Sequence, residues 1–85
     1  MPRKIVIETK NLCGQRIRDE RVGQGLTQTQ FAARMELQGV LWDQKIVSRV
    51  ELQLRAVMDY ELEAAANVLG VSPNQLLYCE KCEKR

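Results

Sequence analysis

Two short helix signatures lie close together between residues 26 and 51. The first begins at Thr27, which favours the N-cap position, and Gln30 follows three residues later, as in a capping box. The second begins at Asp43, whose carboxylate suits both an N-cap and the positive end of a helix dipole. Apolar residues follow each cap at helical spacing: Phe31, Ala32 and Met35 in the first, Val47 and Val50 in the second. This stretch therefore predicts two short helices that pack at an angle, with an alanine where their backbones meet. Such a unit is typical of a helix-turn-helix.

The connection between these two helices, residues 37–42, is longer than the three or four residues usual in a helix-turn-helix. We expect the first helix to gain a turn through Leu37 and to end at Gly39. Leu41 and Trp42 are predicted to pack against the domain. Trp42 directly precedes the Asp43 cap, in the position of a hydrophobic staple.

The segment before this unit predicts one more helix. Asn11 is its predicted cap, and the helix should run to about Gln24, where Gly25 provides a left-handed stop. Its predicted apolar positions are Leu12, Ile17 and Val22. Arg21 also falls on the apolar side, one turn after Ile17, so its charge needs a buried partner. Glu51 is the best candidate, because it follows an apolar stripe on its own helix.

Two further helices are predicted after the central unit. Asp59 can cap a helix that runs to Leu69, and Ser72-Pro73 is a strong start signal for a short helix to Tyr78. The fourth helix should bury Leu62, Ala65, Ala66 and Leu69 and expose Tyr60, Glu61, Glu63 and Asn67. The fifth should bury Leu76 and Leu77.

Composition supports one small helical domain. The chain has 85 residues, enough for one domain, and aromatic residues are only 5% of it, which favours packed aliphatic helices over a β-sandwich. We predict an all-α fold: a compact bundle of five short helices with a central helix-turn-helix. Residues 11–78 would form this domain and residues 79–85 a charged tail. Residues 1–10 would be a short strand, an extended arm or a poorly ordered terminus.

No apolar run approaches the roughly 20 residues needed to span a membrane, and residues 5–7 are too short for a signal-peptide core. We therefore expect a cytoplasmic protein. The three cysteines are an odd number, which argues against a secreted disulfide framework. The net charge of +2 does not by itself indicate a nucleic-acid partner. Basic side chains do gather in and after the second central helix, so the surface is expected to be polarised.

The chain resembles the Cro/C1-type (XRE-type) helix-turn-helix proteins, which include the lambdoid phage repressors. The resemblance covers roughly residues 12–78. The matching residues are Ile17-Arg18-x-x-Arg21, Gly25-Leu26-Thr27-Gln28-x-x-Phe31-Ala32, Val47-Ser48-Arg49-Val50-Glu51, Asp59-Tyr60-Glu61-Leu62 and Ala66-x-x-Leu69-Gly70-Val71-Ser72-Pro73-x-x-Leu76-Leu77. The chain departs from the compact phage repressors in its longer connection and in Glu36, where the short turn usually has glycine. The resemblance implies a lambda-repressor-like fold and a sequence-specific transcriptional regulator, with repression as the expected direction, that binds double-stranded DNA as a homodimer.

The resemblance also implies roles for particular residues. Gln28 matches the glutamine that holds a DNA phosphate, and Arg21 and Glu51 match a buried ion pair between the first and third helices. Thr27, at a helix N-terminus, and Arg55, just after the third helix, are further phosphate candidates. The candidates for base recognition are Gln44, Lys45, Ser48 and Arg49. Glutamine can form paired hydrogen bonds with adenine, and lysine or arginine with guanine. An ordinary solvated helix face is the alternative for these four, and a loop residue in solvent is the alternative for Arg55.

Other functions find less support in the sequence. The alternative is a protein-interaction module, such as an antitoxin-like partner or an adaptor with the same fold. The chain has no histidine, no nucleophile elbow and no glycine-rich phosphate loop, so we expect no enzyme, no cofactor and no small-molecule substrate. Cys79 and Cys82 have the spacing of half a zinc site, or of a redox pair, but a metal would need Cys13 or a second chain as well, and we expect no metal. Leu76, Leu77 and Tyr78 are the predicted dimer surface, unless they only close the core.

Overall fold

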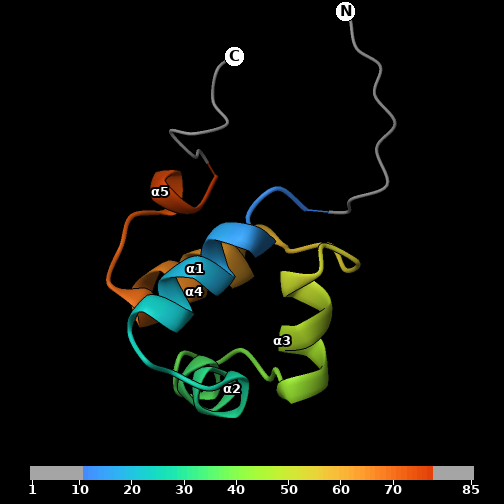
Figure 1. The fold of residues 1–85 in the computed structure, drawn as a ribbon, viewed down its shortest axis with the longest axis vertical. Helices are drawn as coiled ribbons and strands as arrows, with labels where there is room; N and C mark the ends of the chain where they lie inside the picture. Colours follow the sequence, from blue (N-terminus) through green and yellow to red (C-terminus); the bar gives the residue numbers. More distant parts are fainter. Residues whose placement is uncertain (1–10, 78–85) are drawn as a thin grey trace, which may run out of the picture.

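The computed structural model describes residues 11–77, which form five α-helices and no strand (Figure 1). The helices are α1 (Gly14–Gly23), α2 (Gln28–Leu37), α3 (Gln44–Glu51), α4 (Asp59–Leu69) and α5 (Pro73–Leu77). The predicted all-α class is confirmed for this part of the chain. The predicted N-terminal arm, the charged tail, Tyr78, Cys79 and Cys82 lie outside the described residues. Within residues 11–77, no helix has the length and apolar character needed to cross a membrane.

The two central helices begin at the predicted caps. The Thr27 hydroxyl accepts the N–H of Gln30 at 3.0 Å, and the Gln30 side chain accepts the N–H of Thr27 at 2.8 Å. This reciprocal pair is the predicted capping box. At the start of α3, the Asp43 carboxylate accepts the N–H of Ile46 at 2.9 Å. Local sequence therefore determines where α2 and α3 begin.

Two other helix starts differ from the prediction. α1 begins at Gly14, although the Asn11 side chain still accepts the N–H of Gly14 at 2.7 Å. α4 has Met58 rather than Asp59 at its N-cap, because the Glu61 carboxylate reaches back and accepts the N–H of Met58 at 2.8 Å. Asp59 then lies in the first turn, where its charge still suits the helix dipole.

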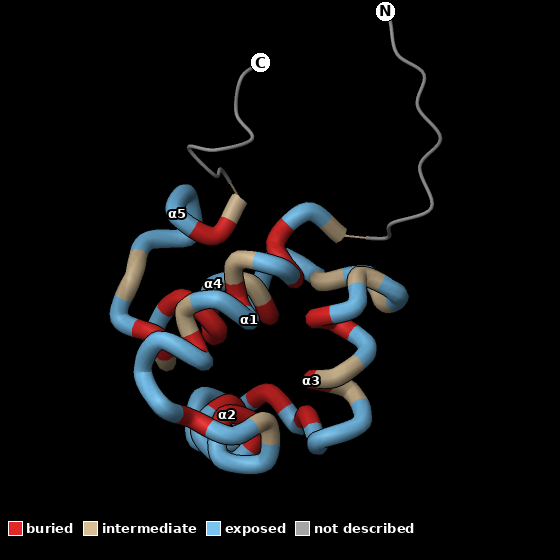
Figure 2. Tube along the Cα trace, viewed as in Figure 1, coloured by how far each residue is buried: buried red, intermediate tan, exposed pale blue. Residues whose placement is uncertain are grey.

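All five helices contribute buried residues to the core (Figure 2). The largest fully buried side chains come from every helix but α4. They are Ile17, Phe31, Met35, Val47, Val50 and Leu76. α4 contributes small residues, Ala64, Ala65 and Ala66, together with Leu69, so that neighbouring helices can approach it closely.

Three apolar residues predicted to be inside are exposed. Leu12 precedes α1 and is 73% exposed, and Val22 is 53% exposed because Gly14, Ile17 and Arg21 form the inner face of that helix. Leu41 is 77% exposed. Its neighbours Val40 and Trp42 are buried instead, and the N–H of Trp42 donates to the Val40 carbonyl at 3.0 Å, so a tight turn at Leu41 leaves this side chain outside.

A close contact holds the C-terminal end of α3 against the start of α1. Gly14 lies so near the Val50 carbonyl that a side chain at position 14 would collide with it. The Asn11 amide donates to the carbonyls of Val50 and Arg55, at 3.1 and 2.7 Å. These contacts fix the orientation of α3 relative to the rest of the bundle.

Candidate nucleic-acid interface

α3 has one buried face and one exposed polar face. Val47, Val50 and Glu51 are buried, and the four predicted base-contacting residues lie on the other side. Of these, Gln44, Lys45 and Arg49 are exposed and Ser48 is half-buried. Their spacing of one and four residues places them on a single stripe of the helix. In Figure 1, α3 stands at one side of the bundle.

The exposed stripe of α3 is positively charged. Lys45 and Arg49 lie one helical turn apart, and among residues 11–77 neither takes part in an ion pair. Glu51 is the only acidic residue of α3, and it points inward. The stripe therefore offers hydrogen-bond donors and positive charge to a partner, with no carboxylate among its four side chains.

A buried ion pair ties α3 to α1. The Nε of Arg21 lies 2.6 Å from Oε2 of Glu51, and its Nη2 lies 3.0 Å from Oε1. The third guanidinium nitrogen donates to the Leu26 carbonyl at 2.7 Å. Both side chains are almost completely buried, at 10% and 3% exposure. The predicted ion pair is thus present, and its charges are compensated by direct contacts.

Gln28 joins this ion pair to the exposed stripe. Its Nε2 donates to Oε1 of Glu51 at 3.1 Å, and its Oε1 accepts from Nε2 of Gln44 at 2.6 Å. The first residue of α2 and the first residue of α3 are therefore side by side. Thr27 lies next to them, exposed, with its hydroxyl oxygen engaged in the cap. The structure brings the predicted phosphate candidates of α2 together with the predicted base-contacting residues of α3.

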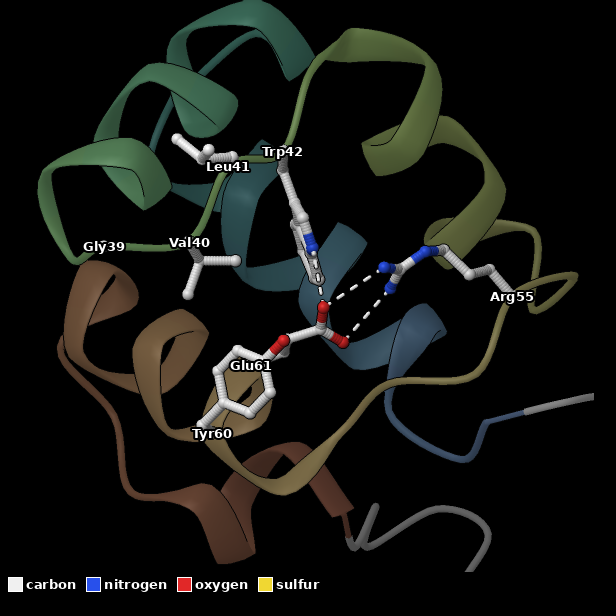
Figure 3. Close-up of a pocket in the computed structure, with 7 residues that line it drawn as sticks. All are labelled: Gly39, Val40, Leu41, Trp42, Arg55, Tyr60 and Glu61. Atoms are coloured by element: carbon white, nitrogen blue, oxygen red, sulfur yellow. Dashed lines mark hydrogen bonds and ion pairs between the residues drawn. The ribbon is translucent and has the colours of Figure 1, made fainter.

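Arg55 forms contacts within the protein that the sequence did not predict. Its guanidinium forms two hydrogen bonds with the Glu61 carboxylate, each 3.1 Å long, and its carbon centre lies 5.5 Å from the ring centroid of Trp42 (Figure 3). The charge of Arg55 is therefore paired within the protein, although its side chain is 33% exposed. These contacts give Arg55 a structural role, and its phosphate-binding role stays a prediction.

Glu61 was predicted to be exposed but is buried, at 3% exposure. Trp42 donates its indole N–H to this carboxylate at 3.3 Å, and Tyr60 lies at the rim of the same shallow pocket (Figure 3). The sequence contained no signal for this role, because methionine does not cap helices and Met58 therefore did not mark Glu61 as the third residue of a capping box. Its partners Trp42 and Arg55 come from distant segments and gave no local signal.

Glu61 gives the fold a pH dependence. Burial by itself raises the pKa of its carboxyl group. The hydrogen bonds from Arg55, Met58 and Trp42, together with the charge of Arg55, outweigh this effect and lower the pKa below its ordinary value of 4.5. Because the folded-state pKa is lowered, ionised Glu61 stabilises the fold above the unfolded-state pKa. That contribution is lost as pH falls through the folded-state pKa.

We expect Glu61→Gln to lower the free energy of unfolding by about 1–3 kcal/mol at pH 7, because the buried network loses its charged acceptor. The difference from wild type should shrink as the pH falls below about 4.5, where the wild-type carboxyl also becomes protonated. Denaturant unfolding between pH 7 and pH 3 measures this. Glu63→Gln, on the exposed side of α4, is the control and should cost little at any pH. If Glu61→Gln lowers the free energy of unfolding by the same amount at every pH, the stabilising role of the ionised Glu61 carboxylate would be contradicted.

Cys13 is a buried thiol with no sign of reactivity. Burial raises its pKa to about 11, so it stays protonated at neutral pH. In the described part of the chain, no three histidine, cysteine, aspartate or glutamate side chains gather in a way that could hold a metal ion.

Comparisons of the chain with protein-family models, with curated proteins and with solved structures found no match. The geometry of α2 and α3 is therefore the basis on which a function can be inferred.

Proposed function

We propose that this chain is a sequence-specific DNA-binding transcriptional regulator of the Cro/C1 type, in which α2 and α3 act as a helix-turn-helix. In this proposal α3 enters the major groove and α2 lies across the backbone. The observation that carries it is the division of α3 into two faces. One face is held in the core by Val47, Val50 and the Arg21–Glu51 pair, and the other presents four polar or basic side chains without an acid.

Gln44 has the hydrogen-bonding groups that adenine requires. One of its two N–H groups donates to Gln28, which leaves the other N–H and the carbonyl oxygen available. Adenine offers an acceptor at N7 and a donor at N6 in the major groove, so the remaining groups of Gln44 match it. Lys45 and Arg49 match the two acceptors of guanine or a phosphate oxygen.

The start of α2 suits a phosphate. The first N–H groups of a helix attract anions, and Thr27 and Gln28 lie at this end, next to Gln44. Gln28 keeps one N–H that is not used by Glu51. A phosphate held here would place the neighbouring base edges within reach of α3.

A homodimer remains part of the proposal, because one small module makes few phosphate contacts. Its predicted surface on α5 stays a prediction. Leu76 is fully buried and Leu77 is half-buried against the core, which favours the alternative that these two leucines close the bundle.

Salt dependence of DNA binding tests the proposal. Wild-type affinity for duplex DNA should fall steeply with salt, because bound phosphates release counterions. We expect Lys45→Ala and Arg49→Ala each to weaken binding. If the substituted residue contacts a phosphate, its loss should also reduce the slope of log K against log salt by about 1. Thermal unfolding of each variant should match wild type, since both side chains are exposed. A wild-type chain that binds no duplex at low salt would contradict the proposal and favour the protein-interaction module.

A further inference from the structure

A continuous chain of hydrogen bonds connects the buried ion pair with the outer face of α3. Arg21 donates to Glu51, Gln28 donates to the same carboxylate at 3.1 Å, and Gln44 donates to Gln28 at 2.6 Å. Exposure rises along this chain: Glu51 is buried, Gln28 is half-buried and Gln44 is exposed. These hydrogen bonds thus connect a fixed charge inside the protein with a side chain that faces solvent.

The carboxylate of Glu51 determines the direction of every hydrogen bond in the chain. An ionised carboxylate only accepts, so Gln28 must present its NH₂ group to Glu51 and its oxygen to Gln44. Gln44 must then present its NH₂ group to Gln28. Its oxygen and second N–H are left for a partner outside the protein. No other arrangement of the two amides satisfies all three contacts.

Glu51 is well placed to impose this direction. Two guanidinium nitrogens of Arg21 hold its oxygens at 2.6 and 3.0 Å, and its side chain is only 3% exposed. Turning the Gln28 amide around would bring its oxygen against the carboxylate and leave a buried acceptor with one partner fewer, which is costly.

We propose that Glu51 is a positioning residue for base recognition: through Gln28, it fixes which end of the Gln44 amide faces the DNA. This inference depends on the proposed function for its DNA consequence. The ordering of the two amides is a property of the protein alone.

Glu51→Gln tests the inference because glutamine keeps the shape of the side chain but is not restricted, as a carboxylate is, to accepting hydrogen bonds. Arg21 donates to both oxygens of Glu51, most closely from Nε to Oε2 at 2.6 Å, so the oxygen of the new amide should take the Oε2 position and its NH₂ group the Oε1 position, which faces Gln28. Gln28 and Gln44 would then both reverse, and Gln44 would offer two N–H donors outward. That pattern suits guanine, with its two acceptors, better than adenine. Arg21→Lys is the matched control, since it weakens the ion pair but keeps the carboxylate.

The first readout needs no DNA. Side-chain NH₂ resonances of Gln28 and Gln44 can be assigned in ¹⁵N-labelled protein with the variants Gln28→Ala and Gln44→Ala. We expect both NH₂ pairs to move in Glu51→Gln and to stay near their wild-type positions in Arg21→Lys. Unmoved resonances in a folded Glu51→Gln protein would overturn the inference, whether or not the chain binds DNA.

The second readout is base preference, measured on the duplex that wild type selects from a random pool. At the base pair where Gln44→Ala loses discrimination, wild type should prefer adenine by roughly 5- to 150-fold. Glu51→Gln should reduce that preference at least about fivefold and shift it towards guanine, whereas Arg21→Lys should keep it. An unchanged adenine preference in Glu51→Gln overturns the inference while leaving the proposed function intact. Failure of wild type to select any sequence counts instead against the function.

Glu51→Gln leaves the Arg21 charge without its ionic partner and can fail to fold. The double variant Arg21→Met, Glu51→Gln removes both charges and keeps the test available. It also lacks the directing carboxylate, so the NH₂ resonances should shift and the adenine preference should fall as in the single variant. Wild-type resonances and preference in this double variant would overturn the inference.

Discussion

Replacement of Glu51 with alanine is expected to lower the free energy of unfolding by about 3–5 kcal/mol, because it leaves the buried charge of Arg21 without a partner. It also removes the acceptor of the Gln28 side chain and cuts the link between α1 and α3. In a domain of this size, each kcal/mol corresponds to a change in Tm of about 4–8 °C. Thermal unfolding followed by circular dichroism should therefore show a loss of well over 10 °C.

Lys45→Ala is the control for this prediction. Lys45 lies on the exposed face of the same helix, and surface substitutions away from special contacts usually change stability by less than about 0.5 kcal/mol. Equal shifts of Tm in Glu51→Ala and Lys45→Ala would show that the Arg21–Glu51 ion pair adds nothing to stability and does not hold α3 against α1.

Trp42→Ala should have an effect of similar size, about 3–5 kcal/mol. The indole is only 6% exposed, and its ring centroid lies 6.3 Å from that of Phe31. Its N–H bonds to Glu61, and the guanidinium of Arg55 lies over its face. The substitution removes all of these contacts and opens a cavity behind the connection between α2 and α3.

The adjacent Leu41→Ala provides a matched comparison for Trp42→Ala. Leu41 is in the same connection but is 77% exposed, so its loss should change the free energy of unfolding by less than about 0.5 kcal/mol. Denaturant unfolding of the two variants measures the difference. Similar losses in both would mean that the connection packs differently from the arrangement described above.

The sequence predicted the features that depend on local signals. Thr27 and Asp43 begin their helices as expected, because a cap is formed by residues three positions apart. The two faces of α3 were predictable from the spacing of Val47 and Val50. The Arg21–Glu51 pair followed from two charges that each lay on an apolar stripe, where a charge needs a partner.

Features that depend on distant segments were not predictable. Glu61 has the pattern of an exposed residue on its own helix, and only the fold brings Trp42 and Arg55 to it. The same contact engages Arg55, which the sequence indicated only as a phosphate candidate or a loop residue in solvent. The hydrogen bond between Gln28 and Gln44 depends on the angle at which α2 and α3 pack, which the long connection leaves open in the sequence.

Selection of DNA sequences from a random duplex pool tests the central claim, that the exposed face of α3 recognises bases. Wild type should enrich a defined sequence. Gln44→Ala should lose discrimination at one base pair by about 1–3 kcal/mol and keep the others. Gln38→Ala, an exposed glutamine at the end of α2, should enrich the wild-type sequence unchanged. If wild type enriches no sequence, or if Gln44→Ala selects the same sequence as wild type at every position, α3 does not read DNA in the way proposed.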